Sequence, residues 1–114
     1  MDAEAHVIAY LSEALGVRVS ADVPPDRPDE LVTVEQLGAQ YGDHALIGHP
    51  SLAIQSWAPT RYRAAELARG VHEAMMALPL AGGPVTHVSP SGPYNFPTRE
   101  HPRYQAAYTL TTHE

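Results

Sequence analysis

The 114-residue sequence predicts an α+β fold, with two helices packed on one side of a largely antiparallel sheet of about four to five strands. Three observations support this fold class. Apolar residues recur at helical spacing in two segments, and in several shorter segments they alternate with polar residues. The resulting order of helix, strands, long helix and strands is typical of helices segregated to one face of an antiparallel sheet. The length fits a single domain over residues 1–114.

Two segments have the apolar spacing of a helix. The first covers residues 2–15, with Asp2 as its N-cap and Gly16 at the left-handed position that ends it. Its apolar stripe consists of Val7, Ile8, Leu11, Ala14 and Leu15. The second covers residues 60–78 and is ended by Pro79. Its apolar stripe consists of Ala64, Leu67, Ala68, Val71, Met75 and Leu78.

Two β-type segments flank a long connection. Residues 31–37 and 51–57 each alternate between apolar and polar side chains, which predicts half-buried strands. We expect them to pair antiparallel. The intervening residues 38–50 hold three glycines and a proline, so the sequence predicts an irregular connection longer than a hairpin needs.

The last segment with period-two alternation is residues 104–111, which predicts a closing strand. Shorter strands are expected at residues 17–19, 85–89 and 94–96, the last two around a turn at residues 90–93. Three prolines within residues 22–29 predict a stiff loop there, because proline fixes φ and removes a backbone donor.

The composition argues against several classes of function. The net charge is −6, and the seven basic residues are all arginines scattered along the chain, so no basic stripe suits a nucleic-acid backbone. The absence of cysteine excludes disulfides, thiolate metal sites and cysteine nucleophiles. No apolar run approaches the roughly 20 residues that span a bilayer, so we expect a soluble, cytoplasmic chain without a membrane partner.

Histidine is the residue to test first for catalysis or metal binding. His44 and His49 share one connection with Asp43, but neither an HExxH pattern nor a third ligand at fixed spacing accompanies them. No serine lies in a G-x-S-x-G elbow, and no glycine-rich loop leads a strand into a helix. The sequence therefore predicts no catalytic residue, no cofactor and no metal ligand.

Aromatic residues in turn-rich segments indicate a protein interface instead. Tyr41 lies in the 38–50 connection together with His44 and His49, while Tyr94 and Phe96 lie between two prolines. Aromatic side chains are enriched at interface cores because each buries much area at low entropic cost. We predict these five residues as interface residues. The alternative is that Tyr94 and Phe96 cover an edge of their own sheet.

Three stretches of the chain follow a pattern seen in a known family. They are residues 18–24 running through Arg27-Pro28-Asp29 into 32–35, residues 52–57 running through Thr60-Arg61 to position 68, and residues 91–94 running through Phe96-Pro97 to 102–105. In this order the chain resembles the tail terminator proteins of siphophages and related prophages. It departs from the family pattern at residues 36–39, where members often carry a basic residue and paired glycines, and at Thr98, where they often carry an acid.

The resemblance implies a subunit that forms a hexameric ring, caps the growing tail tube, stops tube polymerisation and offers a surface for head attachment. The implied partners are further copies of the chain, the tail tube protein and a head–tail connector or stopper protein. DNA passes through such a ring without sequence-specific binding, and an acidic wall keeps it from sticking. The implied location is the tail–neck junction of the virion, after assembly in the host cytoplasm.

Three other interpretations stay open. A head–tail stopper or tail-completion protein also forms a ring of small subunits, and sequence physics does not separate it from a terminator. A small metal-binding domain or enzyme built on His44 and His49 belongs to another class. An antitoxin-like or regulatory binding module would be a monomer or dimer with a defined peptide or nucleic-acid partner.

Overall fold

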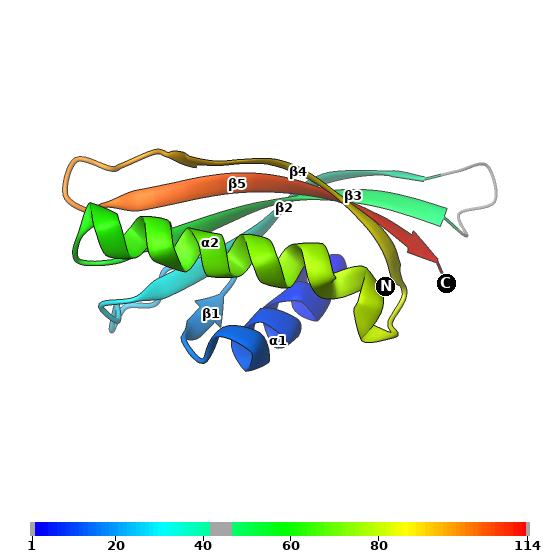
Figure 1. Ribbon diagram of the computed structural model, residues 1–114, viewed down its shortest axis with the longest axis horizontal. Coiled ribbons are helices and arrows are strands. Elements are labelled where there is room, and N and C mark those ends of the chain that lie inside the picture. The colour runs from blue at the N-terminus through cyan, green and yellow to red at the C-terminus, as the bar shows by residue number, and fades with distance from the viewer. Residues whose placement is uncertain (1, 42–46, 114) are drawn as a thin grey trace.

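The computed structural model describes residues 2–41 and 47–113, which form a sheet with two helices on one of its faces (Figure 1). The helices are α1 (Ala3–Leu15) and α2 (Arg61–Ala77), and a short 3-10 helix, η1 (Leu78–Ala81), follows α2. The strands are β1 (Arg18–Ser20), β2 (Leu31–Tyr41), β3 (Ile47–Trp57), β4 (Val85–Asn95) and β5 (Arg103–His113). They lie in the order β1-β2-β3-β5-β4, and only the β1–β2 pair is parallel. The predicted α+β fold is confirmed.

Local capping sets the helix ends. The Asp2 carboxylate accepts a hydrogen bond from the Ala5 backbone N–H at 3.0 Å, and Gly16 ends α1 with φ of 68°. The Thr60 hydroxyl accepts from the Arg63 N–H at 3.1 Å, while the prolines of η1 and beyond prevent α2 from continuing. Ala14, expected in the buried stripe of α1, is exposed. Within the described ranges, no helix is long and apolar enough to cross a membrane.

The predicted irregular connection over residues 38–50 was wrong. β2 continues to Tyr41 and β3 begins at Ile47, so most of this segment forms the two arms of a hairpin. Gly38 follows a bulge, where the register shifts after Gln36 and glycine is readily accommodated. Pro50 pairs with Ala39 of β2, and the ladder to β5 is interrupted at His49 and Pro50, where the proline has no N–H to donate. Pairing with both neighbours thus overrides the local turn signals.

The predicted turn at residues 90–93 was also wrong, because β4 runs through it as one strand. Pro90 pairs with Tyr108, and the register shifts between Ser91 and Tyr94, around a cis bond from Gly92 to Pro93. β4 lies at one edge of the sheet. A proline there can point its nitrogen, which carries no hydrogen, toward solvent without removing a hydrogen bond from the ladder. Its edge position therefore explains how β4 accommodates these prolines.

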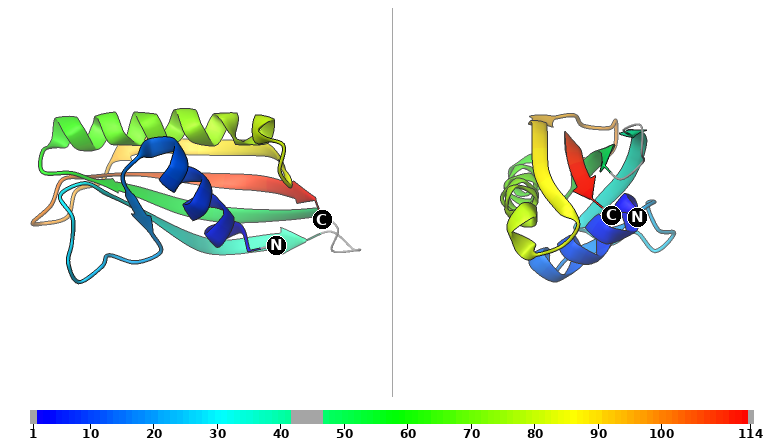
Figure 2. Two further views of the ribbon diagram at one scale, coloured as in Figure 1. Left: turned by 90° about the horizontal axis from the view of Figure 1, so that it is seen from below. Right: turned by 90° about the vertical axis from the view of Figure 1, so that its right-hand side faces the viewer.

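The hydrophobic core lies between the sheet and the helices (Figure 2). It is built from residues that alternate along the strands and recur at helical spacing in α1 and α2, as the sequence predicts. Its fully or almost fully buried members include Val7, Leu11, Val32, Val34, Leu52, Ile54, Val71, Met75, Tyr108 and Leu110. Tyr108 is the largest of these, and its hydroxyl lies 3.2 Å from Nδ1 of His72 on α2. The single polar atom of this core side chain is thereby satisfied.

The edge of β2 is capped by a side chain from α1. β1 covers only the first three residues of β2, and further along the Glu4 carboxylate accepts a hydrogen bond from the Gln36 N–H at 2.9 Å. The carboxylate also lies in the first turn of α1, where the helix dipole favours negative charge. One side chain thus connects the start of the chain to the edge of the sheet.

Replacing Glu4 with Ala is therefore expected to lower the free energy of unfolding by about 1–2 kcal/mol, from the lost charged hydrogen bond and the dipole interaction. Chemical denaturation followed by far-UV circular dichroism measures this loss. Glu13→Ala, an exposed acid on the same helix, is the control and should leave stability within about 0.5 kcal/mol. Equal losses in both variants would show that the bond to Gln36 contributes nothing.

Candidate functional site

The sheet face opposite the helices is uncovered, and we call it the open sheet face. Small and polar side chains occupy it. Directly paired residues of neighbouring strands point to the same side, so the strand register identifies which residues lie on this face. They include Thr33, Glu35, His49, Ser51, Ala53, Gln55, His87, Ser89, Ser91, Gln105, Ala107, Thr109 and Thr111. Side-chain hydrogen bonds join β3 to β5 along this face: Gln55 donates to Gln105 at 2.9 Å, and the Ser51 and Thr109 hydroxyls lie 2.9 Å apart. This surface is polar, and hydrogen bonds between side chains link its central strands.

A hollow of about 320 Å³ lies at the β2 side of the open sheet face. Its apolar rim consists of Leu37, displaced by the bulge of β2, and Val23 from the proline-rich loop. These two side chains are 60% and 41% exposed. Asp22 and Glu35 bring two carboxylates to the same hollow. The surface here is apolar at its rim and acidic.

A stack of rings and guanidinium groups, the tryptophan stack, closes one end of the open sheet face. Trp57 ends β3 and pairs directly with Arg103 at the start of β5. The Arg103 guanidinium lies 4.9 Å from the centre of the Trp57 ring and 4.6 Å from that of Phe96. Arg27 lies 4.6 Å from the Trp57 ring centre. Such cation–π contacts strengthen as the groups lose water.

Hydrogen bonds fix the members of the tryptophan stack. The Trp57 indole N–H donates to the Thr33 hydroxyl at 3.2 Å, and Arg103 Nε donates to the Phe96 carbonyl at 2.7 Å. Partial burial lowers the pKa of the Arg103 guanidinium, which nevertheless stays protonated, as arginine does in proteins. Trp57 is only 7% exposed, although it lies on the face without helices. The two arginine side chains therefore take the place of a covering layer.

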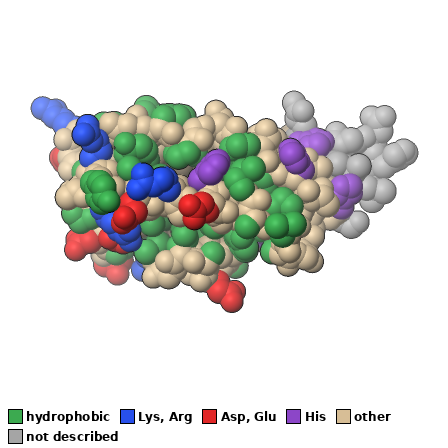
Figure 3. Space-filling view, viewed as in Figure 1, with side chains coloured by type: hydrophobic (Ala, Val, Ile, Leu, Met, Phe, Trp, Pro, Cys, Tyr) green, Lys and Arg blue, Asp and Glu red, His purple; other side chains and the backbone are tan. Residues whose placement is uncertain are grey.

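The loop that carries Arg27 is anchored to α2. Arg63 donates two hydrogen bonds to the Glu30 carboxylate, from Nε at 2.6 Å and from Nη2 at 2.7 Å, and a third to Glu66. The hydrogen bond from Arg63 holds the pKa of Glu30 below its usual value. Figure 3 shows arginines gathered at this end of the molecule, with histidines toward the other. At this end Arg63 is paired with acids, and Arg27 and Arg103 are stacked on aromatic rings.

Two predicted interface residues lie beside the tryptophan stack. The rings of Tyr94 and Phe96 pack edge to face with their centres 6.3 Å apart, and the side chains are 46% and 47% exposed. Tyr94 pairs with Gln105, which places it on the open sheet face. These two aromatics therefore cover part of their own sheet and stay about half exposed, and their role in an interface stays a prediction.

The other predicted interface residues lie toward the opposite end of the sheet. His49 is on β3, with its Nδ1 3.3 Å from the Thr111 hydroxyl, and about 27 Å of strand separates it from Trp57. Tyr41 ends β2, where its backbone pairs with Gly48. His44 and Asp43 lie outside the described residues. His49 therefore does not share one site with Tyr94 and Phe96, and the interface role of all five residues stays a prediction.

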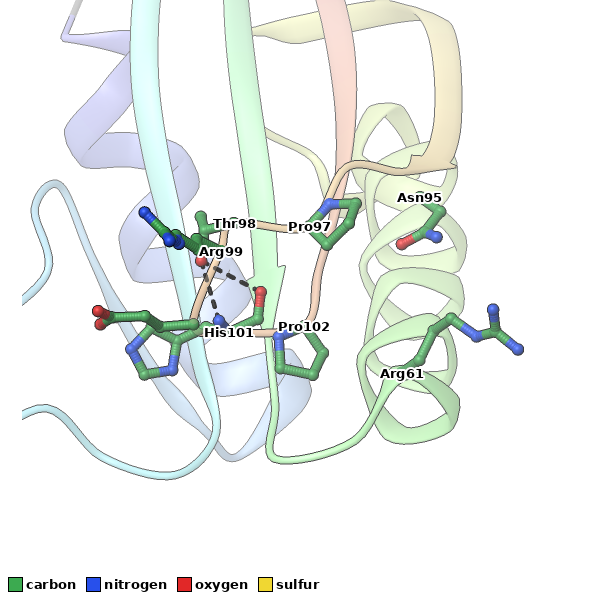
Figure 4. A pocket seen from close by; sticks show the side chains of 8 residues that line it. Arg61, Asn95, Pro97, Thr98, Arg99, His101 and Pro102 are labelled. Atoms are coloured by element: carbon green, nitrogen blue, oxygen red, sulfur yellow. Dashed lines mark hydrogen bonds between the residues drawn. The ribbon is translucent and has the colours of Figure 1, made fainter.

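The hollow beside the β4–β5 hairpin does not gather reactive groups. It encloses about 370 Å³ and is lined by Arg61, Asn95 and residues 97–102. Figure 4 shows Arg61 and Arg99 pointing in different directions, away from a common centre. Thr98 and His101 tie the hairpin together, with the His101 N–H donating to the Thr98 hydroxyl at 3.0 Å. Across residues 2–41 and 47–113, no three histidine or acidic side chains are grouped to hold a metal ion.

No protein-family model matches this chain, and no curated protein matches its sequence.

Sequence reasoning missed the tryptophan stack. The alternation predicted for residues 51–57 places Trp57 on the side of the strand away from Leu52 and Ile54, and the strand register agrees. Nothing in the sequence indicated that Arg27, thirty residues earlier, reaches the same ring. The only available signal was a large aromatic residue on the polar side of a strand, which requires a cover that the helices do not provide.

Proposed function

We propose that the chain is a tail terminator subunit, copies of which close into a hexameric ring that caps a phage tail tube and stops its growth. Its partners are the tail tube protein below and a head–tail connector or stopper protein above. DNA passes through the ring without sequence-specific contacts, in keeping with the net charge of −6. The ring belongs at the tail–neck junction.

One observation carries the proposal. The three stretches that resemble tail terminators are distant in sequence, yet each contributes to the tryptophan stack: Arg27 from the first, Trp57 from the second, and Phe96 with Arg103 from the third. Residues that share one stack constrain one another's identity. The three stretches that resemble tail terminators are therefore parts of one structural unit in the folded chain. Proteins that share a fold are expected to share such a unit, which supports the resemblance.

The surface also suits an assembly subunit. Tyr94 and Phe96 present half-exposed rings beside a rigid stack, and such preorganised aromatics are typical of interface hot spots. A closed ring needs two different patches on each subunit, related by rotation, and it needs no reaction centre. The polar open sheet face with its apolar rim provides one such patch.

The test measures assembly directly. The mass of the purified chain is followed by light scattering, alone and with the tail tube protein of the same phage or prophage, and tube lengths are measured by electron microscopy. We expect rings at tube ends and shorter tubes. Rings that bind a connector and ignore tubes would assign the chain to the stoppers. A monomer that retains stoichiometric zinc would favour a metal-binding domain or enzyme built on His44 and His49. A monomer or dimer that binds a nucleic acid or a peptide would favour a regulatory binding module.

Replacing Tyr94 with Ser is expected to reduce ring formation while lowering the free energy of unfolding by less than about 1 kcal/mol, because the ring is half exposed. Light scattering and thermal unfolding of the same samples separate the two effects. Ser12→Ala, on the exposed face of α1, is the control and should change neither. Normal assembly by the Tyr94 variant would remove this residue from the interface.

Tyr41→Ala, at the opposite end of the sheet, is expected to weaken assembly in the same way.

A further inference from the structure

The exposed large hydrophobic residues of the described chain fall into two groups on opposite faces. Val23, Leu37, Tyr94 and Phe96 border the open sheet face. Tyr62, Met76 and Leu80 belong to α2 and η1, which pack on the other face, and they are 73%, 41% and 88% exposed. Figure 3, which looks onto the side of the molecule that carries α2, shows hydrophobic side chains at the surface among charged ones. Two distinct apolar patches are what a head-to-tail contact requires.

The sheet edges are poorly suited to joining subunits. β4 carries Pro90 and Pro93, and its register is interrupted twice. β2 is covered at its start by β1 and capped at Gln36 by the Glu4 carboxylate. Prolines, bulges and covered donors are the devices by which proteins prevent strand addition. Contacts through the faces of the subunit are therefore favoured over contacts through its edges.

Charge on the two patches is complementary. On the helix side, Tyr62, Arg69 and Met76 recur every seven residues and so lie along one line of α2. Glu66 on this surface is engaged by Arg63, Arg61 and Arg69 are exposed, and Glu73 lies one turn beyond Arg69. On the sheet side, Asp22 and Glu35 place carboxylates between the apolar residues of the hollow. α2 holds three arginines against two glutamates, so its surface is net positive, whereas Asp22 and Glu35 give the hollow on the sheet side a negative charge.

We infer that the exposed face of α2 in one subunit docks on the open sheet face of the next copy, an inference that rests on the proposed ring. Leu37 and Val23 pack against the apolar residues of the neighbouring α2, and Arg69 of that helix faces Glu35 and Asp22. Every subunit uses both patches, so the contact is heterologous and closes by rotation. Each open sheet face then acquires the helical cover that it lacks in the single chain.

Engineered cysteines test this contact cleanly, because the native chain contains none. Leu37→Cys and Met76→Cys variants are prepared separately. A parallel set uses Tyr62→Cys in place of Met76→Cys, because α2 of the neighbour can lie on the sheet in either of two orientations. After mild oxidation of rings, we expect cross-linked dimers when a sheet-side variant is mixed with a helix-side variant, and multimers when both cysteines are in one chain. Ser12→Cys is the control and should not cross-link. Cross-links only between identical variants, or none in either set, would overturn the inference.

Charge reversal gives a second, independent readout. Arg69→Glu is expected to weaken ring formation by about tenfold or more, as reversal of an interfacial charge does, and Glu35→Arg on the same chain is expected to restore much of it. Unchanged assembly in both single variants contradicts the proposed contact. If rings form on tubes but neither cysteines nor charge reversal respond, only this inference fails. If the unmodified chain never forms rings, the proposed function fails with it.

Discussion

Replacing Trp57 with Ala is expected to lower the free energy of unfolding by about 3–5 kcal/mol, the largest effect of any single substitution considered for this protein. The ring is 7% exposed and is held between Arg27 and Arg103, so its removal leaves a cavity and two guanidinium groups without their partner. It also leaves the Thr33 hydroxyl without the indole donor. Urea denaturation followed by far-UV circular dichroism measures the loss, since the variant has no tryptophan left for fluorescence.

Two further variants locate the origin of that loss. Trp57→Phe keeps an aromatic face for both arginines but loses the indole N–H, so we expect about 1–2 kcal/mol of destabilisation. Tyr62→Ala removes an aromatic residue that is 73% exposed and should change stability by less than about 0.5 kcal/mol. If Trp57→Ala lowers the free energy of unfolding no more than Tyr62→Ala does, the tryptophan stack does not stabilise this end of the sheet.

The second large effect is expected at alkaline pH. Burial of Tyr108 raises the pKa of its phenol from the ordinary value of 10.0 to about 12. Because the folded-state pKa is the higher one, the associated stability is fully present below pH 10 and is lost as the pH rises through about 12. At about 1.4 kcal/mol for each pKa unit, the loss amounts to about 3 kcal/mol. Denaturation curves recorded between pH 9 and pH 12 measure it.

Tyr108→Phe provides the comparison for this prediction. Phenylalanine cannot ionise, so the difference in stability between the two proteins should shrink and then reverse as the pH rises across this range. At neutral pH the variant should be less stable by about 1 kcal/mol, because the hydrogen bond between Tyr108 and His72 is lost. Parallel pH profiles for the two proteins would mean that Tyr108 ionises like an exposed tyrosine. Absorbance of tyrosinate in both proteins identifies which phenol titrates.

The elements that sequence reasoning identified are those governed by local chemistry. Asp2, Gly16 and Thr60 signal helix ends because capping depends on residues a few positions apart. The alternation of Val32 with Thr33 and of Leu52 with Ala53 fixes which side of each strand faces the core.

The ends of the strands could not be predicted from the sequence, because the effect of a proline or glycine depends on where in the sheet its strand lies. Pro90 and Pro93 are tolerated because β4 is an edge strand, and Pro50 is tolerated because β3 is held from both sides by its neighbours. Edge or centre is a property of strand order, and strand order depends on pairings between distant segments. Turn signals alone therefore predicted breaks where the chain continues.

The sequence by itself determined the α+β class, the two helices with their caps, the inward faces of the strands and the lack of an enzymatic motif, because each depends on composition or on spacing along the chain. Tertiary structure alone decided that Tyr94 and Phe96 lie far from His49, and that Arg27, Trp57 and Arg103 meet in one stack. It also decided that apolar residues from α2 and from the open sheet face form two opposite patches. Such contacts join residues tens of positions apart, and only the packing of the sheet and helices brings them together.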